Sequence, residues 1–133
     1  MVNIIYPTLA KIIEYNKLLI QEIKVKKKDK AHLLSKRKLE ECILECKNIK
    51  GDIYDKAVCL LKGIIQKHAF ASGNRRTAFF VTERFLEDNH KKILIKNIEN
   101  QARVLQGIRE GFYTDEEIKH WIMIGEIHEF KRR

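Results

Sequence analysis

Proline and glycine are scarce in this sequence, whose 133 residues include one proline and six glycines. Sandwiches and barrels need many turns, and these two residues are the ones that most often make them. The apolar residues, 44% of the chain, fall instead in blocks separated by lysines. The scarcity of turn residues therefore favours a helical bundle over an all-β fold.

Long apolar runs are also missing. The longest uninterrupted run covers residues 57–61, whereas a helix needs roughly 20 apolar residues to cross a bilayer. The opening segment MVNIIYPTLAKII has no basic residue ahead of its apolar residues and no small-residue cleavage site, so it does not resemble a secretion signal. We therefore expect a cytoplasmic protein without a membrane partner.

Cysteine is present in an odd number, as Cys42, Cys46 and Cys59. In a chain without an export signal this favours reduced thiols over a disulfide framework. Cys42 and Cys46 are four residues apart and would share a helix face, but neither a second pair nor a nearby histidine completes the four ligands of a zinc site. We expect buried structural thiols.

Positive charge is concentrated in one part of the chain. The formal net charge is +9, and residues 24–38 carry eight lysines and arginines against one aspartate. Such a cluster attracts phosphate backbones, acidic proteins or anionic lipids. No aromatic residue is interleaved with it, which argues against a surface for single-stranded nucleic acid. We interpret it as a solvated loop and helix face that suits an acidic partner; nucleic-acid binding stays an alternative based on charge alone.

Apolar residues recur at three- and four-residue steps along most of the chain, which is the period of helices with one buried face. The fifth expected helix is followed by Gly111 as a stop signal, and Thr114 and Glu117 have the spacing of a capping box at the start of the last. Residues 93–95 fit either a short extended segment or a turn. We expect an all-α fold, a single compact bundle of about six helices, with helices near residues 8–24, 33–47, 54–68, 74–89 and 98–110 and from 114 onward.

The stretch HAFASGNRRT, residues 68–77, lies between two of these helices and combines residue types that suit a phosphate site. Gly73 lets the backbone approach a ligand, and the amides of Gly73, Asn74 and Arg75 would lie at the first turn of the next helix. Free N–H groups and the positive end of the helix dipole attract anions there. Arg75 and Arg76 add planar cations that bind phosphoryl oxygens bidentately.

His68 stands at the other end of the same stretch. An imidazole beside a bound phosphate is suited to take a proton from an attacking hydroxyl, and Phe70 would enter the core and hold the loop. The structural alternative is a plain connector between two buried helices, with both arginines solvated.

The same stretch resembles the signature of the Fic/Doc family, which runs His, often Pro, Phe, any residue, Asp or Glu, Gly, Asn, Gly or Lys, Arg. Arg75 replaces the lysine that is common in the Doc-like (death-on-curing) toxin branch. The length of the chain, its opening YPTL segment and its closing GFYTDEEIKHWI segment resemble that branch too. The residues that match the signature are His68, Phe70, Gly73, Asn74 and Arg76, with Thr77 and Ala78 continuing as in Doc-like proteins.

The resemblance implies one Fic/Doc-like domain over residues 1–133 that uses ATP to modify a hydroxyl of a target protein. Fic members mostly transfer AMP, whereas Doc transfers the terminal phosphoryl group to a translation elongation factor. The roles implied by position are a general base for His68, a loop anchor for Phe70, a phosphate cradle for Gly73 and Asn74, and a clamp on the phosphate chain for Arg76 with Arg75 beside it.

Two positions depart from the signature. Ala69 stands where proline is common, which loosens the loop without removing a functional group. Ser72 stands at the acidic position that usually holds Mg²⁺, and a neutral hydroxyl is a poorer ligand for this ion than a carboxylate. Either the nucleotide and water hold the metal, or Arg75 substitutes for part of its charge, or catalysis is weak.

For the stretch of residues 68–77, three functions are therefore open. The first is a Doc-like toxin that phosphorylates a target protein, which the cationic Arg75 favours over the second, a protein adenylyltransferase. The third, motivated by Ser72, is a catalytically impaired module that binds a nucleotide or a partner. No Ser or Thr has Glu four residues later, the spacing of the self-inhibitory helix of some Fic proteins, so we expect a separate antitoxin. The sequence predicts no oligomeric state.

Overall fold

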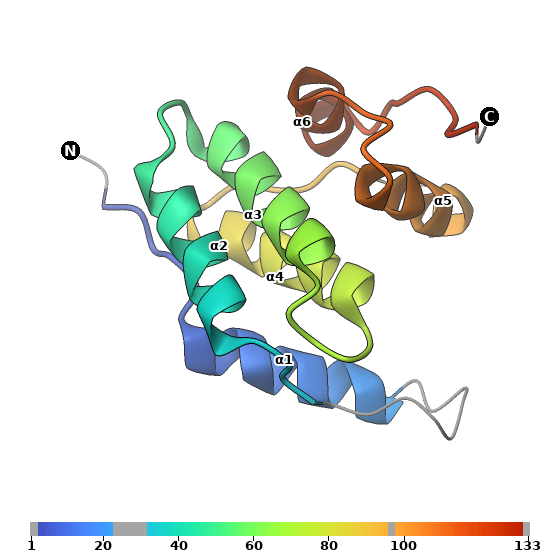
Figure 1. The fold of residues 1–133 in the computed structure, drawn as a ribbon. Helices are drawn as coiled ribbons and strands as arrows, with labels where there is room; N and C mark the ends of the chain where they lie inside the picture. Colours follow the sequence, from blue (N-terminus) through green and yellow to red (C-terminus); the bar gives the residue numbers. More distant parts are fainter. Residues whose placement is uncertain (1–2, 23–31, 96–97, 132–133) are drawn as a thin grey trace.

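The computed structural model of the protein describes residues 3–22, 32–95 and 98–131, and these ranges contain six α-helices (Figure 1). Within them, Leu33 and Phe70 form an isolated antiparallel bridge rather than a strand pair. The predicted all-α bundle of about six helices is confirmed. The helices are α1 (Leu9–Glu22), α2 (Lys36–Asn48), α3 (Ile53–Lys67), α4 (Asn74–Asp88), α5 (Ile98–Arg109) and α6 (Asp115–Ile124).

Helix α3 forms the centre of the bundle, because it packs against α2, α4, α5 and α6. Helix α1 packs against α4 and lies below it in Figure 1, and α5 and α6 each pack against α3 at the upper right of that view. The core is made by the apolar face of α3, including Leu61 and Ile64, and by a broad stripe of α4 that includes Val81 and Phe85. Burial of these side chains stabilises the bundle by about 1.5–3 kcal/mol each.

Local caps set several helix ends where the sequence predicts them. At the start of α6 the Glu117 N–H donates to Thr114 Oγ1 at 3.1 Å, and the Thr114 N–H donates to Glu117 Oε1 at 2.9 Å. Gly111 follows α5 in the left-handed region with φ +72°, where glycine carries no Cβ penalty. The predicted capping box and stop signal are confirmed.

The prediction that the second helix begins at Leu33 is wrong. Helix α2 begins at Lys36, because the hydroxyl of Ser35 caps it by accepting the Lys38 N–H at 3.2 Å. Leu33 and Leu34 precede this cap. Their spacing to the apolar residues of α2 satisfies the helical period, but their backbone pairs with a distant loop described below.

The C-terminal end of α2 is capped by a buried side chain from α3. Lys56 is 7% exposed, and its Nζ donates to the carbonyls of Cys46, Lys47 and Ile49 at 3.2, 3.1 and 3.0 Å. The last carbonyls of a helix lack partners within the helix, so this ammonium satisfies acceptors at the end of α2, among them the carbonyl of the buried Cys46.

Two of the three cysteines are buried as predicted. Cys42 and Cys46 are fully buried between α2 and α3, Cys59 is half-buried, and all three are free thiols. Burial raises the pKa of Cys42 and of Cys46 to about 12. Thiols in this state are structural apolar groups rather than nucleophiles.

Some predictions fall at or beyond the limits of the described residues. Residues 23–31, which hold most of the basic cluster and the predicted end of the first helix, lie outside them. Residues 93–95 form neither helix nor strand, and the Leu94 N–H donates to the Ile122 carbonyl in α6 at 3.0 Å. Of the helices in the described ranges, none is long and apolar enough to span a membrane.

Candidate functional site

The residues singled out by the sequence lie on the loop between α3 and α4 and on the first turn of α4. His68 ends α3 in the left-handed region, with φ 52° and ψ 56°. Gly73 begins α4 in the same region, with φ 76° and ψ 18°. Left-handed residues are uncommon outside glycine, and here they bracket the loop and turn the chain from one buried helix into the next.

Phe70 and Asn74 hold the inside of the loop together. Phe70 is 1% exposed, and its N–H donates to Asn74 Oδ1 at 3.0 Å. Asn74 Nδ2 donates to the Phe70 carbonyl at 2.8 Å. The Asn74 side chain is thus buried and hydrogen-bonded within the loop, which leaves its backbone N–H as the group that could make the predicted phosphate contact.

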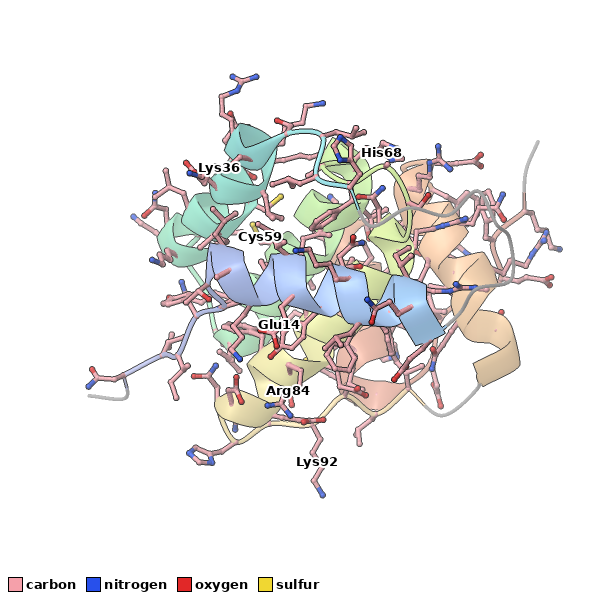
Figure 2. All side chains as sticks on the ribbon, turned by 90° about the horizontal axis from the view of Figure 1, so that it is seen from below. Glu14, Lys36, Cys59, His68, Arg84 and Lys92 are labelled. Atoms are coloured by element: carbon pink, nitrogen blue, oxygen red, sulfur yellow. The ribbon has the colours of Figure 1, made fainter. Side chains whose placement is uncertain are left out.

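His68 lies at the edge of this buried network. Its Nδ1 is 3.1 Å from Asn74 Nδ2, while the residue as a whole is exposed. Figure 2 shows His68 on the opposite side of the view from Arg84 and Lys92, which mark the far end of α4. A ring that is anchored at one nitrogen and open to solvent is suited to act on a ligand bound at the start of α4.

Within the part of the chain that the structure describes, the backbone N–H groups at the N-terminus of α4 have no side-chain acceptor. The first intrahelical bond runs from the Thr77 N–H to the Gly73 carbonyl at 2.9 Å. The amides of Asn74, Arg75 and Arg76 therefore precede the hydrogen-bonded part of the helix, where the helix dipole favours an anion.

Arg75 and Arg76 are both exposed on this first turn. Among the ion pairs formed by the described residues, none involves either guanidinium. Arg84 on the same helix differs, because it pairs with Glu87 at 3.8 Å and with Asp88 at 3.9 Å. The two arginines beside the loop are thus the cations of α4 that are left to bind an external anion.

A buried asparagine of α1 supports the loop from below. Asn16 is 1% exposed, and its Nδ2 donates to the Ser72 carbonyl and to Thr77 Oγ1, both at 3.0 Å. Gly73 packs so closely on α1 that a Cβ there would lie 2.9 Å from Ile20 Cδ1. Sequence reasoning missed Asn16, whose only signal is a polar residue within an apolar helical stripe.

An extended segment ahead of α2 pairs with the loop. The N–H groups of Leu34 and Ser35 donate to the Ala69 carbonyl at 2.8 and 3.1 Å, and the Ala71 N–H donates to the His32 carbonyl at 2.8 Å. These bonds and the contacts with α1 hold the loop through both its backbone and its buried side chains. The pairing was not predicted, because the two segments are far apart in the sequence.

The loop does not fit a magnesium ion held by protein carboxylates. Residues 68–77 contain no Asp or Glu, and Ser72 is half-buried with its carbonyl bonded to Asn16. In the part of the chain that the structure describes, no three His, Cys, Asp or Glu side chains gather in a way that could hold a metal ion. Magnesium prefers carboxylate and phosphate oxygens, so phosphate groups are its better source of ligands here.

The structure thus brings His68, Phe70 and Asn74 into one hydrogen-bonded loop, and it places Arg75 and Arg76 at the exposed helix end that follows. Their roles toward a nucleotide stay predictions. What the arrangement offers chemically is a row of backbone donors, two arginines without acidic partners among the described residues, and an anchored imidazole on one short stretch of chain.

Comparison with known proteins places this loop in a family. Residues 6–86 match the model of the Fic/DOC family, a span that runs from the segment before α1 into the last turn of α4 and includes the whole loop. Comparison with curated proteins gave no match. The family suggests a nucleotide-dependent transferase of the Fic kind. Because the match covers more than half of the chain, this protein belongs to the Fic/DOC family.

Proposed function

We propose that this protein is a Doc-like transferase that binds ATP at the start of α4 and moves the terminal phosphoryl group to a hydroxyl of a target protein. One observation carries the proposal: the uncapped end of α4 bears two exposed arginines without acidic partners among the described residues, next to the anchored imidazole of His68. Phosphoryl transfer relies on positioning and charge stabilisation, and these groups supply both.

In the proposed reaction the phosphate chain lies against the backbone N–H groups of residues 74–76. Arg76 binds the phosphoryl oxygens bidentately, and Arg75 adds a second positive charge. The target hydroxyl attacks the terminal phosphorus; the new O–P bond forms as the bond to the bridging oxygen breaks and ADP leaves. His68 takes the proton of the hydroxyl. Mg²⁺ bound to the nucleotide would neutralise part of the phosphate charge, and residues 68–77 would add no carboxylate ligand to it.

A translation elongation factor is the target that the resemblance to the Doc-like branch suggests. We also propose a separate antitoxin, because none of the Ser and Thr residues has the spacing of a self-inhibitory helix. The excess of positive charge over residues 24–38 suits an acidic partner of this kind.

A second candidate, an impaired module that binds a nucleotide without transferring any part of it, is favoured by Ser72. A metal ion that bridges phosphates commonly supplies several kcal/mol of transition-state stabilisation. A loop without a carboxylate for the ion is expected to lose part of this effect.

The test is transfer of label from ATP carrying ³²P at either the α or the γ position, with purified protein and a bacterial lysate. We expect a labelled protein band from γ-labelled ATP alone, lost in His68→Asn and Arg76→Ala. Asparagine tolerates the left-handed backbone at this position, so His68→Asn removes the imidazole without strain. Arg84→Ala is the matched control, since it removes an exposed arginine at the far end of α4.

The other outcomes each select a different function. Label from α-labelled ATP alone refutes the kinase and identifies an adenylyltransferase. No label from either nucleotide, with ATP binding that Arg76→Ala weakens, identifies the impaired module. Absence of both label and ATP binding refutes the proposed site.

A further inference from the structure

The backbone of Phe70 determines which way round the Asn74 side-chain amide lies. The oxygen and nitrogen of an amide are alike in shape, so their hydrogen-bond partners decide the assignment. The Phe70 N–H can only donate and lies 3.0 Å from Oδ1, and the Phe70 carbonyl can only accept and lies 2.8 Å from Nδ2. The reverse orientation would set donor against donor and acceptor against acceptor.

This orientation decides the hydrogen bond between Asn74 and His68. Nδ2 of Asn74 carries two hydrogens and no lone pair that accepts, and one hydrogen is directed to the Phe70 carbonyl. His68 Nδ1 lies 3.1 Å from the same nitrogen, so Nδ1 accepts the second hydrogen. A neutral imidazole carries one proton on its two nitrogens, and with Nδ1 as acceptor that proton is on Nε2.

We infer that Asn74 is a positioning residue that holds neutral His68 in the tautomer with its proton on Nε2. Three contacts carry this inference, two to the Phe70 backbone and one to the imidazole. Asn74 is buried and His68 is exposed, so the amide acts from beneath the ring. The assignment stands on the geometry alone; its catalytic meaning rests on the proposed function.

The resting imidazole accordingly presents an N–H donor on the side of the ring away from Asn74. This donor suits a phosphate oxygen bound at the start of α4. To accept the proton of a hydroxyl at Nε2, the ring must first lose its own Nε2 proton and take up a proton on Nδ1. The Nδ1–H would then face the Nδ2–H of Asn74, donor against donor. A net hydrogen bond of this kind shifts the ratio of two forms by about two- to tenfold, so Asn74 lowers the population of the form that accepts at Nε2.

The test is long-range ¹H–¹⁵N correlation NMR of the ¹⁵N-labelled full chain at about pH 8.5, two units above the ordinary imidazole pKa. His68→Asn identifies the signals of His68, and the exposed His90, also left-handed with φ 62°, serves as an internal reference. We expect the His68 pattern to show a protonated Nε2 and an unprotonated Nδ1. A major form with the proton on Nδ1 in the wild-type protein overturns the inference.

Asn74→Asp separates positioning from mere packing. The carboxylate has nearly the shape of the amide and accepts hydrogen bonds only, so it should draw the proton to Nδ1 and reverse the His68 tautomer, while the His90 pattern stays unchanged. The negative charge is favoured at the start of α4, although the bond to the Phe70 carbonyl is lost. A folded Asn74→Asp variant in which His68 keeps the wild-type tautomer contradicts the positioning role.

If the Asn74→Asp variant does not fold, Asn74→Ala tests the same positioning role. There the ratio of His68 tautomers should move toward that of His90, and no movement contradicts the inference. None of these spectra needs a nucleotide or a target. The tautomer can therefore be refuted while transfer activity is intact, and the labelled-ATP assay can fail while the tautomer is as stated.

Discussion

Replacement of Gly73 by alanine tests whether α1 forms the floor of the proposed phosphate loop. Gly73 has φ +76°, and a Cβ built on it would lie 2.9 Å from Ile20 Cδ1 and 3.3 Å from Asn16 Nδ2. Alanine in the left-handed region costs roughly 1–2 kcal/mol on conformational grounds alone. Overpacking against α1 adds to this loss, and overpacking typically costs about 1–3 kcal/mol.

Gly111→Ala is the matched control for the conformational part. Gly111 has φ +72°, and no atom lies within 4 Å of a Cβ built there. Ile20 is only half-buried, so its terminal methyl can move and the overpacking at Gly73 should be near the lower limit. We expect losses of about 1–2 kcal/mol for Gly111→Ala and about 2–3 kcal/mol for Gly73→Ala. Each kcal/mol corresponds to a fall in Tm of roughly 3–5 °C at this chain length.

Urea unfolding of the two variants, combined with Ile20→Val, measures the contact directly. Valine lacks the Cδ1 atom nearest to the added Cβ, so the double variant Gly73→Ala with Ile20→Val should recover most of the excess loss, a coupling of about 1 kcal/mol. Gly73→Ala should also weaken ATP binding, while Gly111→Ala should not. Equal losses for the two alanine variants, or no coupling with Ile20→Val, would refute the close packing of the loop on α1.

Three further predictions concern the scaffold. Lys56→Met should lower the free energy of unfolding by about 1–3 kcal/mol, because it leaves one buried and two part-buried carbonyls at the end of α2 without this donor. Replacement of the exposed Lys50 by Met should change the free energy of unfolding by less than about 0.5 kcal/mol. Equal effects of the two variants in urea unfolding would contradict the cap. The Thr114 N–H holds the pKa of Glu117 below its ordinary value of 4.5, so this carboxylate stabilises the fold above that pH and the effect is lost as the pH falls through the lower folded-state pKa. As the pH falls from about 5 to about 3, the Glu117→Gln variant should therefore lose less free energy of unfolding than the wild type. Parallel curves of the free energy of unfolding against pH for the two proteins would contradict this role of Glu117. With a thiol reagent at about pH 8, the half-buried Cys59 should react first and the two buried thiols of α2, with pKa values raised to about 12, only on unfolding; equal rates for all three in the native protein would disprove this.

The accuracy of sequence reasoning varied along the chain for a physical reason. The start of α6 was predictable because its cap, Thr114 with Glu117, is made by residues three apart. The start of α2 was not, because Leu33 and Leu34 keep the apolar spacing of a helix while their neighbourhood pairs with residues 69–71. Periodicity records which residues are apolar, and it does not distinguish a buried helix face from a segment that pairs with a distant loop.

The candidate site shows the same division. Its residue types could be predicted because His68, Gly73 and the two arginines lie within one contiguous stretch. The inward orientation of the Asn74 amide could not be predicted, since it depends on the folded path of the loop. The support from Asn16 could not be predicted either, because its partner Ser72 is 56 residues away.

The sequence by itself determined the helical class, most of the helix ends, the burial of two thiols and the stretch that carries the family signature, since each depends on composition, local capping or contiguous residues. The tertiary structure alone decided how that stretch is held: from below by α1, along its backbone by the residues before α2, and from within by an amide that faces His68. Hydrogen bonds between residues far apart in the chain form only after the bundle has brought those residues together, so local sequence patterns do not predict them.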